Sequence, residues 1–159
     1  MNKIAFRAIG LVALLAGPAL AEDVVIPFAT DDAEMNAAID KARASLPEFW
    51  SKFAAPAANE DDFSLKLGIS DGSQTEHFWC GQIEGNAQDA TCVIANEPID
   101  VFTVAYGERV KVDPTEISDW LYYRDNKIVG AETLRVMLPH LEKKEAAAMR
   151  ALLGDPQDQ

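Results

Sequence analysis

Glu76 and His77, two adjacent residues with acid–base side chains, are followed by the aromatic pair Phe78 and Trp79. The pattern predicts a strand here, and successive side chains of a strand point to opposite faces of its sheet. Glu76 and His77 are therefore not expected to form a direct acid–base pair. We expect Lys66, on a neighbouring strand, to lie across from Glu76. A structural salt bridge is the favoured interpretation, and a polar anchor in a binding groove is the alternative.

A second group of side chains places carboxylates before aromatic rings: Asp113, Glu116 and Asp119, then Trp120, Tyr122 and Tyr123. Carboxylates beside aromatic rings can bind a sugar or a cationic group, and two carboxylates can in principle catalyse glycoside hydrolysis. The favoured interpretation is that Trp120 and one tyrosine fill the core, while Asp119 caps a turn or pairs with Arg135. Asp119, Trp120 and Arg135 are the best functional candidates, because charged and aromatic groups that converge on one face mark binding surfaces.

The segment Gly68–Gly72 matches the G-x-S-x-G pattern of a nucleophile elbow. An elbow needs a strand-to-helix turn on a large parallel sheet. Here Ser70 precedes Asp71-Gly72, a dipeptide typical of tight hairpin turns. The segment is therefore predicted to be a turn between two strands.

No metal site and no cofactor are predicted. His77 and His140 are the only histidines, and zinc sites draw on histidine, cysteine and carboxylate side chains. The aspartate spacing of a calcium loop is also absent from the sequence.

Cys80 and Cys92 are the only cysteines, and their spacing excludes a C-x-x-C redox motif. They flank the polar stretch Glu84–Asp89, which is typical of a hairpin turn. A disulfide across the two strands of this hairpin is expected, since a cysteine pair in an oxidising compartment is usually bridged.

The first 21 residues, Met1–Ala21, have the features of a secretory signal peptide. Lys3 and Arg7 provide a basic start, an apolar run follows, and Ala19-Leu20-Ala21 carries small residues before the expected cut. The apolar run is shorter than the roughly 20 residues of a membrane-spanning helix. We expect export to the periplasm with cleavage after Ala21, and no membrane anchor after cleavage.

The charge of the chain argues against two classes of partner. The formal net charge is −12 at pH 7, which repels nucleic acid and anionic membrane surfaces. Hydrophobic residues make up 48% and charged residues 25% of the sequence, as in an ordinary globular domain. The expected partner is a protein or a small molecule, and the oligomeric state is left open.

Helical patterns occur near both ends of the chain. Asp31 and Glu34 match a reciprocal capping pattern, which predicts a helix that begins at Asp31. Pro47 suits the start of a second short helix that carries Phe49, Trp50 and Phe53. Further helices are expected over Ala131–Leu138 and Leu141–Leu153, and Asp155–Gln159 is expected to be a disordered tail.

Strand patterns fill the middle of the chain. Phe63–Ser70 alternates strictly between apolar and polar or small residues, which predicts a half-buried strand. The other expected strands are Thr75–Ile83, Ala90–Ala95, Arg109–Val112, Trp120–Arg124 and Lys127–Val129. This order predicts an α+β fold: an antiparallel sheet of about four to six strands, with an N-terminal helix and C-terminal helices packed on it. A single domain is expected over 22–154.

Several motifs carry a family resemblance: Ile117–Tyr122 followed by Gly130, Thr133 and Arg135, and before them Lys66, Glu76–Trp79 and Asn96-x-Pro98. Together they resemble the YegJ-like family of small bacterial proteins, a domain of unknown function (DUF2314). The resemblance extends from about the first helix to Arg135. It implies a compact α+β domain that is often exported, and it implies no established activity.

Our functional expectation is a periplasmic binding module that uses one face of the sheet. The expected contact residues are Lys66, Glu76, Trp79, Asn96, Asp119, Trp120 and Arg135. The alternative is a periplasmic hydrolase with Glu76 or Asp119 as its acid or base, and a structural protein of the envelope is a third hypothesis. No catalytic residue is assigned.

Export gives the first testable expectation. Protein recovered from the periplasm should begin at Glu22, because the peptidase recognises the small residues Ala19 and Ala21. Intact-mass analysis of that fraction measures the N-terminus directly. A membrane-bound species that retains Met1–Ala21 would contradict the expectation.

Overall fold

The computed structural model describes residues 3–7, 25–29 and 31–154. Most of the expected signal peptide, and the expected tail 155–159, lie outside the described residues. Lys3–Arg7, which falls within the expected signal peptide, forms strand β1, and Val25–Ala29 forms strand β2.

Two consecutive helices follow, α1 (Ala33–Ala44) and α2 (Leu46–Ala54). The N-cap of α1 is Asp32, whose carboxylate accepts a hydrogen bond from the backbone N–H of Met35 at 2.8 Å. The prediction that Asp31 begins the helix was therefore wrong by one residue. Asp32 takes this position because its oxygen reaches the exposed N–H three residues along the first turn. As predicted, a helix with Pro47 in its first turn carries Phe49, Trp50 and Phe53.

Six strands make up the central antiparallel sheet: β3 (Glu60–Ser70), β4 (Thr75–Glu84), β5 (Thr91–Ile94), β6 (Arg109–Lys111), β7 (Ile117–Arg124) and β8 (Lys127–Gly130). The strands β2, β1, β4, β3, β7 and β8 are neighbours in that order, with β5 paired to β4 and β6 paired to β5. The α+β fold and the antiparallel sheet are confirmed. The N-terminal strands enlarge the sheet to eight, and β1 is parallel to β4.

Two predicted hairpin turns are present. Asp71-Gly72 joins β3 to β4, and the Asp71 carboxylate accepts hydrogen bonds from the N–H groups of Ser73 and Gln74. Asp125-Asn126 joins β7 to β8, and both residues have a positive φ, as a tight hairpin turn of this kind requires.

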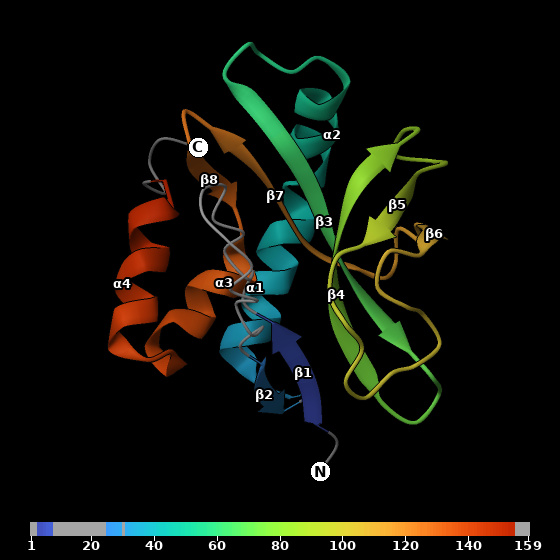
Figure 1. Ribbon diagram of the computed structural model, residues 1–159, viewed down its shortest axis with the longest axis vertical. Helices are drawn as coiled ribbons and strands as arrows, with labels where there is room; N and C mark the ends of the chain where they lie inside the picture. Colours follow the sequence, from blue (N-terminus) through green and yellow to red (C-terminus); the bar gives the residue numbers. More distant parts are fainter. Residues whose placement is uncertain (1–2, 8–24, 30, 155–159) are drawn as a thin grey trace.

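The chain ends in α3 (Glu132–Met137), a short 3₁₀ turn (Leu138–His140) and α4 (Lys143–Leu152). Helices α3 and α4 pack on one face of the sheet. Strands β5 and β6 continue the sheet beyond the edge of β4 that faces away from β3 (Figure 1). Helix α1 packs against α3 and β7.

The sheet therefore separates two apolar clusters. One is built around Phe49, Leu65, Phe78, Trp120 and Tyr122. The other is built around Met35, Ile39, Trp79, Leu121 and Leu134. Strand β3 was predicted to be half-buried, yet Leu65, Lys66 and Leu67 are all fully buried at its centre. Both faces are covered, because α3 and α4 pack on one side while α2 and the loops around β5 cover the other.

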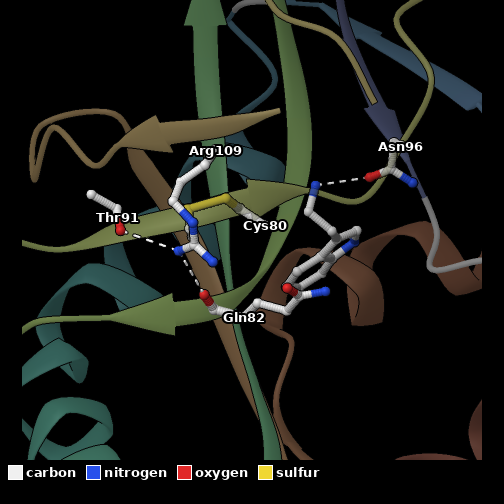
Figure 2. The surroundings of a disulfide bond; sticks show 7 residues. Cys80, Gln82, Thr91, Asn96 and Arg109 are labelled. Atoms are coloured by element: carbon white, nitrogen blue, oxygen red, sulfur yellow. Dashed lines mark hydrogen bonds between the residues drawn. A yellow bond between two sulfur atoms is a disulfide. The ribbon is translucent and has the colours of Figure 1, made fainter. Parts of the chain in front are cut away.

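The predicted disulfide between Cys80 and Cys92 is confirmed and joins β4 to β5, with the two α-carbons 5.6 Å apart. Beside it, the Arg109 guanidinium donates hydrogen bonds to the carbonyl oxygen of Gln82 and the hydroxyl of Thr91, as Figure 2 shows. The bridge and Arg109 together hold the short strand β5 against the end of β4.

Gly130, the last residue of β8, gives a prediction about the close contact between β8 and Trp120 of β7. A β-carbon at Gly130 would lie 2.5 Å from the carbonyl oxygen of Trp120 and 2.6 Å from its ring, and the residue has φ +83°. Gly72 has a comparable φ of +93° and no atom within 4 Å of the same position. Gly130→Ala should lower the free energy of unfolding by about 3 kcal/mol or more. Gly72→Ala should lower it by about 1 kcal/mol.

Urea unfolding measures the loss in free energy of unfolding for both variants. The loss for Gly72→Ala reports the positive φ alone, and the additional loss for Gly130→Ala reports the contact of the new β-carbon with Trp120. Equal losses for Gly130→Ala and Gly72→Ala would show that the contact with Trp120 is unimportant.

Candidate functional site

Lys66 lies at the centre of β3 between two other predicted site residues. The register places it beside Trp79 of β4 and Asp119 of β7. Its ammonium group donates a hydrogen bond to the hydroxyl of Thr133 at 3.1 Å and lies 5.0 Å from the centre of the Trp79 ring. The expected position of Lys66 across from Glu76 was wrong, because Ile69 is opposite Glu76 in the register.

Asp119 is buried on the same face and receives hydrogen bonds from four groups. The backbone N–H groups of Trp120, Glu132 and Thr133 donate to it at 2.9, 3.2 and 2.8 Å, and the Thr133 hydroxyl donates at 2.6 Å. The carboxylate thus satisfies N–H groups in the first turn of α3, which would otherwise be buried without partners. We call Lys66, Asp119 and Thr133 the buried charge network.

Burial and charge act in opposite directions within this network. Burial lowers the pKa of Lys66 to about 8, although the neighbouring Asp119 opposes the change. Burial also raises the pKa of Asp119, against the effects of the Lys66 ammonium and the hydrogen bonds from Thr133 and Trp120. Each group is therefore a counter-charge of the other in a region that solvent does not reach.

His77 is buried next to the network and does not titrate near neutral pH. Its Nδ1 lies 2.7 Å from the Ser118 hydroxyl, which donates to the carbonyl oxygen of Lys66. Burial, followed by the positive charges of Lys66 and Arg43, lowers the pKa of His77 to about 3. The ring is neutral under physiological conditions, so its role is packing and hydrogen bonding rather than proton transfer.

Glu76 points to the opposite face of the sheet and has a different set of partners. Its carboxylate accepts hydrogen bonds from the N–H groups of Ile99, Asp100 and Val101, at distances from 2.9 to 3.2 Å. These donors belong to the segment between β5 and β6. Glu76 is fully buried, so it holds this segment by hydrogen bonds that water does not compete for.

The segment of residues 97–107, which we call the anchored loop, is also fixed at other points. Just before it, the Asn96 side chain accepts a hydrogen bond from the N–H of Trp79 at 2.9 Å (Figure 2), and the N–H of Ala95 donates to the carbonyl oxygen of Trp79. Val101 is buried in the core. Glu76, Trp79 and Asn96, three of the predicted site residues, thus position the anchored loop.

The outer side of the anchored loop carries exposed apolar side chains. Ile99 is 48% exposed, Phe102 is 75% exposed and Tyr106 is 62% exposed. Sequence reasoning did not select these residues, because the stretch has neither helical nor strand periodicity. A cluster of large apolar residues without periodicity, between two predicted strands, is the signal that could have identified it.

The two remaining predicted residues lie elsewhere. Trp120 faces the cluster that contains Phe49, and its indole N–H donates to the carbonyl oxygen of Ala42 at 2.9 Å. Arg135 is half-buried on α3 and donates to the carbonyl oxygen of Gly154. The seven predicted residues therefore do not share one open face: Lys66, Trp79 and Asp119 line one side of the sheet, and Glu76 and Trp120 line the other.

Glu76 and Asp119, the carboxylates considered for hydrolysis, are both fully buried. Each carboxylate accepts hydrogen bonds from several backbone N–H groups, and the two carboxylates lie on opposite faces of the sheet. This arrangement directs their oxygens to N–H groups of the protein backbone. Within residues 31–154 and the two N-terminal strands, no group of three or more His, Cys, Asp or Glu side chains could hold a metal ion. No helix in the same described part is both long and apolar enough to cross a membrane.

Comparisons with known proteins identify relatives but no activity. The family model described as "Uncharacterized protein conserved in bacteria (DUF2314)" matches residues 32–155. The chain is 33% identical to the uncharacterized protein YegJ of Escherichia coli K12, over 96% of this chain and 99% of that protein. It is 26% identical to a putative ankyrin repeat protein of Neisseria meningitidis serogroup B, over 86% of this chain and 59% of that protein. No solved structure matches.

The buried charge network gives a prediction with a matched control. Asp119→Asn should lower the free energy of unfolding by about 3–5 kcal/mol, because it removes a buried negative charge that stabilises the buried Lys66 ammonium. Asp113 makes the same two contacts with Thr115, to its N–H and its hydroxyl, but on the exposed surface. Asp113→Asn should cost no more than about 1 kcal/mol.

Urea unfolding at pH 7 measures both changes. Thr133→Val adds a milder test, since losing the shared hydroxyl should cost about 1–3 kcal/mol. If the Asp119 and Asp113 variants lost equal stability, the charge of Asp119 would not matter to the fold.

Proposed function

The chain belongs to the DUF2314 family of uncharacterized bacterial proteins, and from that premise we propose that it is an exported, periplasmic binding module. Its contact surface is the anchored loop. The observation that carries this proposal is the combination of three exposed apolar side chains, Ile99, Phe102 and Tyr106, on a segment whose backbone is held by buried Glu76.

A fixed backbone matters because binding is weakened by the entropy lost when a flexible segment becomes ordered. Glu76 and Val101 hold the inner side of the anchored loop, so its outer side chains are presented with little further ordering. Large apolar and aromatic residues at the centre of an interface commonly contribute most of the binding free energy. The loop therefore has the composition and the rigidity of a recognition element.

The shape and charge of the loop favour a protein partner. Small molecules bind in concave pockets, whereas Phe102 and Tyr106 project from the surface. Glu97, Asp100 and Glu108 are exposed around them, and the whole chain is acidic. The complementary partner is a protein with an apolar pocket bordered by basic residues.

Two features support the proposed compartment. Met1–Ala21 has the composition of a secretory signal peptide, and the Cys80–Cys92 bridge is of the kind that persists in an oxidising compartment. In the periplasm, the anchored loop would be accessible to other exported proteins, and the proposed partner is one of these.

Site-specific photo-crosslinking in the native periplasm tests the proposal. A photoreactive side chain at Ile99 should give one discrete protein adduct, and the same group at Lys144, which is exposed on α4, should not. Phe102→Ser combined with Tyr106→Ser should reduce the Ile99 adduct by more than about tenfold, as expected for loss of central contacts. The adduct should also decrease as salt is added, because a basic partner is attracted by charge.

Thermal unfolding must show that the doubly substituted protein is as stable as the parent, since both side chains are exposed. Equal adducts from Ile99 and Lys144, or an Ile99 adduct unaffected by the two substitutions, would contradict a contact surface on the anchored loop. An adduct that is insensitive to salt would contradict the basic partner alone.

A further inference from the structure

The edge of β4 that faces away from β3 is shared by three segments. Strand β5 occupies one end, where it pairs with Cys80–Glu84. Ala95 and Asn96 contact the backbone of Trp79. Strand β1 occupies the other end, in a parallel pair at Ala5 and Glu76.

The backbone groups that β1 meets on this edge can be identified from the alternation of the strand. The N–H and C=O of Trp79 point to this edge, since they bond to Asn96 and Ala95. The pairing of β3 with β4 runs without interruption from Thr75 to Cys80. Because backbone groups alternate between the two edges of a strand, those of His77 and Thr75 also point toward Ala5.

Strand β2 pairs with β1 and with no other described strand. The pairing is antiparallel from Lys3↔Ala29 to Arg7↔Val25, with Pro27 opposite Ala5. Since β1 is parallel to β4, β2 runs antiparallel to β4, with Pro27 level with Glu76. Strand β2 thus already has the direction of an antiparallel neighbour of β4, at a distance of two strand spacings.

We propose that the edge of β4 at Thr75–His77 is a strand-acceptor site, and that Val25–Ala29 fills it once Met1–Ala21 has been removed. The segment moves sideways by one strand spacing, about 4.8 Å, into the place of β1. Ile26 then lies opposite His77, and Pro27 lies opposite Glu76. This inference rests on the proposed export, because cleavage after Ala21 removes β1 from the chain.

The position of Pro27 supports this register. Proline has no N–H and is tolerated in a strand where that group would point away from the partner. Opposite Glu76, whose backbone groups face β3, Pro27 occupies a pair without hydrogen bonds. Its neighbours Ile26 and Phe28 then direct their backbone groups to His77 and Thr75. A shift of register by one residue would place Pro27 opposite a residue that needs its N–H.

A chain that begins at Glu22 keeps the described apolar core and the disulfide. Both described apolar clusters lie between Met35 and Leu153, and the disulfide lies within β4 and β5. This chain, produced without the leader, is therefore the protein to examine by NMR. A contact between the α-protons of Pro27 and Glu76 is expected, since these protons are close in an antiparallel pair without hydrogen bonds.

Two proline substitutions provide a matched comparison of hydrogen exchange at the His77 amide. Ile26→Pro removes an N–H that faces β4 and disturbs the paired backbone, so exchange should accelerate by at least about tenfold, the factor for one lost hydrogen bond. Val25→Pro removes an N–H that faces away, and exchange should be unchanged. Circular dichroism and a closed Cys80–Cys92 disulfide serve as the control that both variants are folded.

The inference is overturned by the absence of the α-proton contact, or by equal exchange in the Ile26→Pro and Val25→Pro variants. Failure of the chain that begins at Glu22 to fold with its disulfide closed would overturn it too, because β1 would then be essential. Export is judged separately, from the mass of the periplasmic protein. A cleaved protein without the contact refutes strand replacement alone, and an uncleaved periplasmic protein refutes the export on which it depends.

Discussion

The attraction between the buried charges of Lys66 and Asp119, which the Thr133 hydroxyl links by hydrogen bonds, is the constraint on which the arrangement of sheet and helices depends. An ammonium and a carboxylate buried at the centre of a sheet are tolerated only when each has the other and further hydrogen bonds as partners. Those partners come from β3, from β7 and from the start of α3. A shift of β3 by one residue would turn Lys66 into the opposite apolar cluster, so the pair favours one register and one docking position for α3.

Glu76 and Asp119 perform the same physical task on opposite faces of the sheet. Each is a buried carboxylate that accepts hydrogen bonds from backbone N–H groups of one segment. For Glu76 the segment is the anchored loop, and for Asp119 it is the first turn of α3. Acidic residues in these positions resemble catalytic candidates in the sequence, because a carboxylate followed by aromatic residues has the same sequence pattern in either role. In the structure, the oxygens of both carboxylates accept hydrogen bonds from backbone N–H groups.

Local patterns were sufficient to predict much of the fold. The hairpin turns at Asp71-Gly72 and Asp125-Asn126, the second helix with Pro47 in its first turn and the Cys80–Cys92 bridge all follow from short-range chemistry. The partner of Lys66 did not, because β3 lies between β4 and β7, and that strand order depends on contacts far apart in the sequence. The exposure of Phe102 was also beyond sequence reasoning, since it depends on how Glu76 and Val101 hold the rest of the loop.

The burial of Lys66 has a consequence for its chemistry with amine reagents. A pKa of about 8 gives this side chain a larger unprotonated fraction at neutral pH than an ordinary lysine, yet no reagent reaches it in the closed protein. Its acylation must wait for an opening that separates α3 from the sheet. Lys66 is therefore an internal reporter: its labelling rate, compared with that of exposed lysines, measures how often this domain opens.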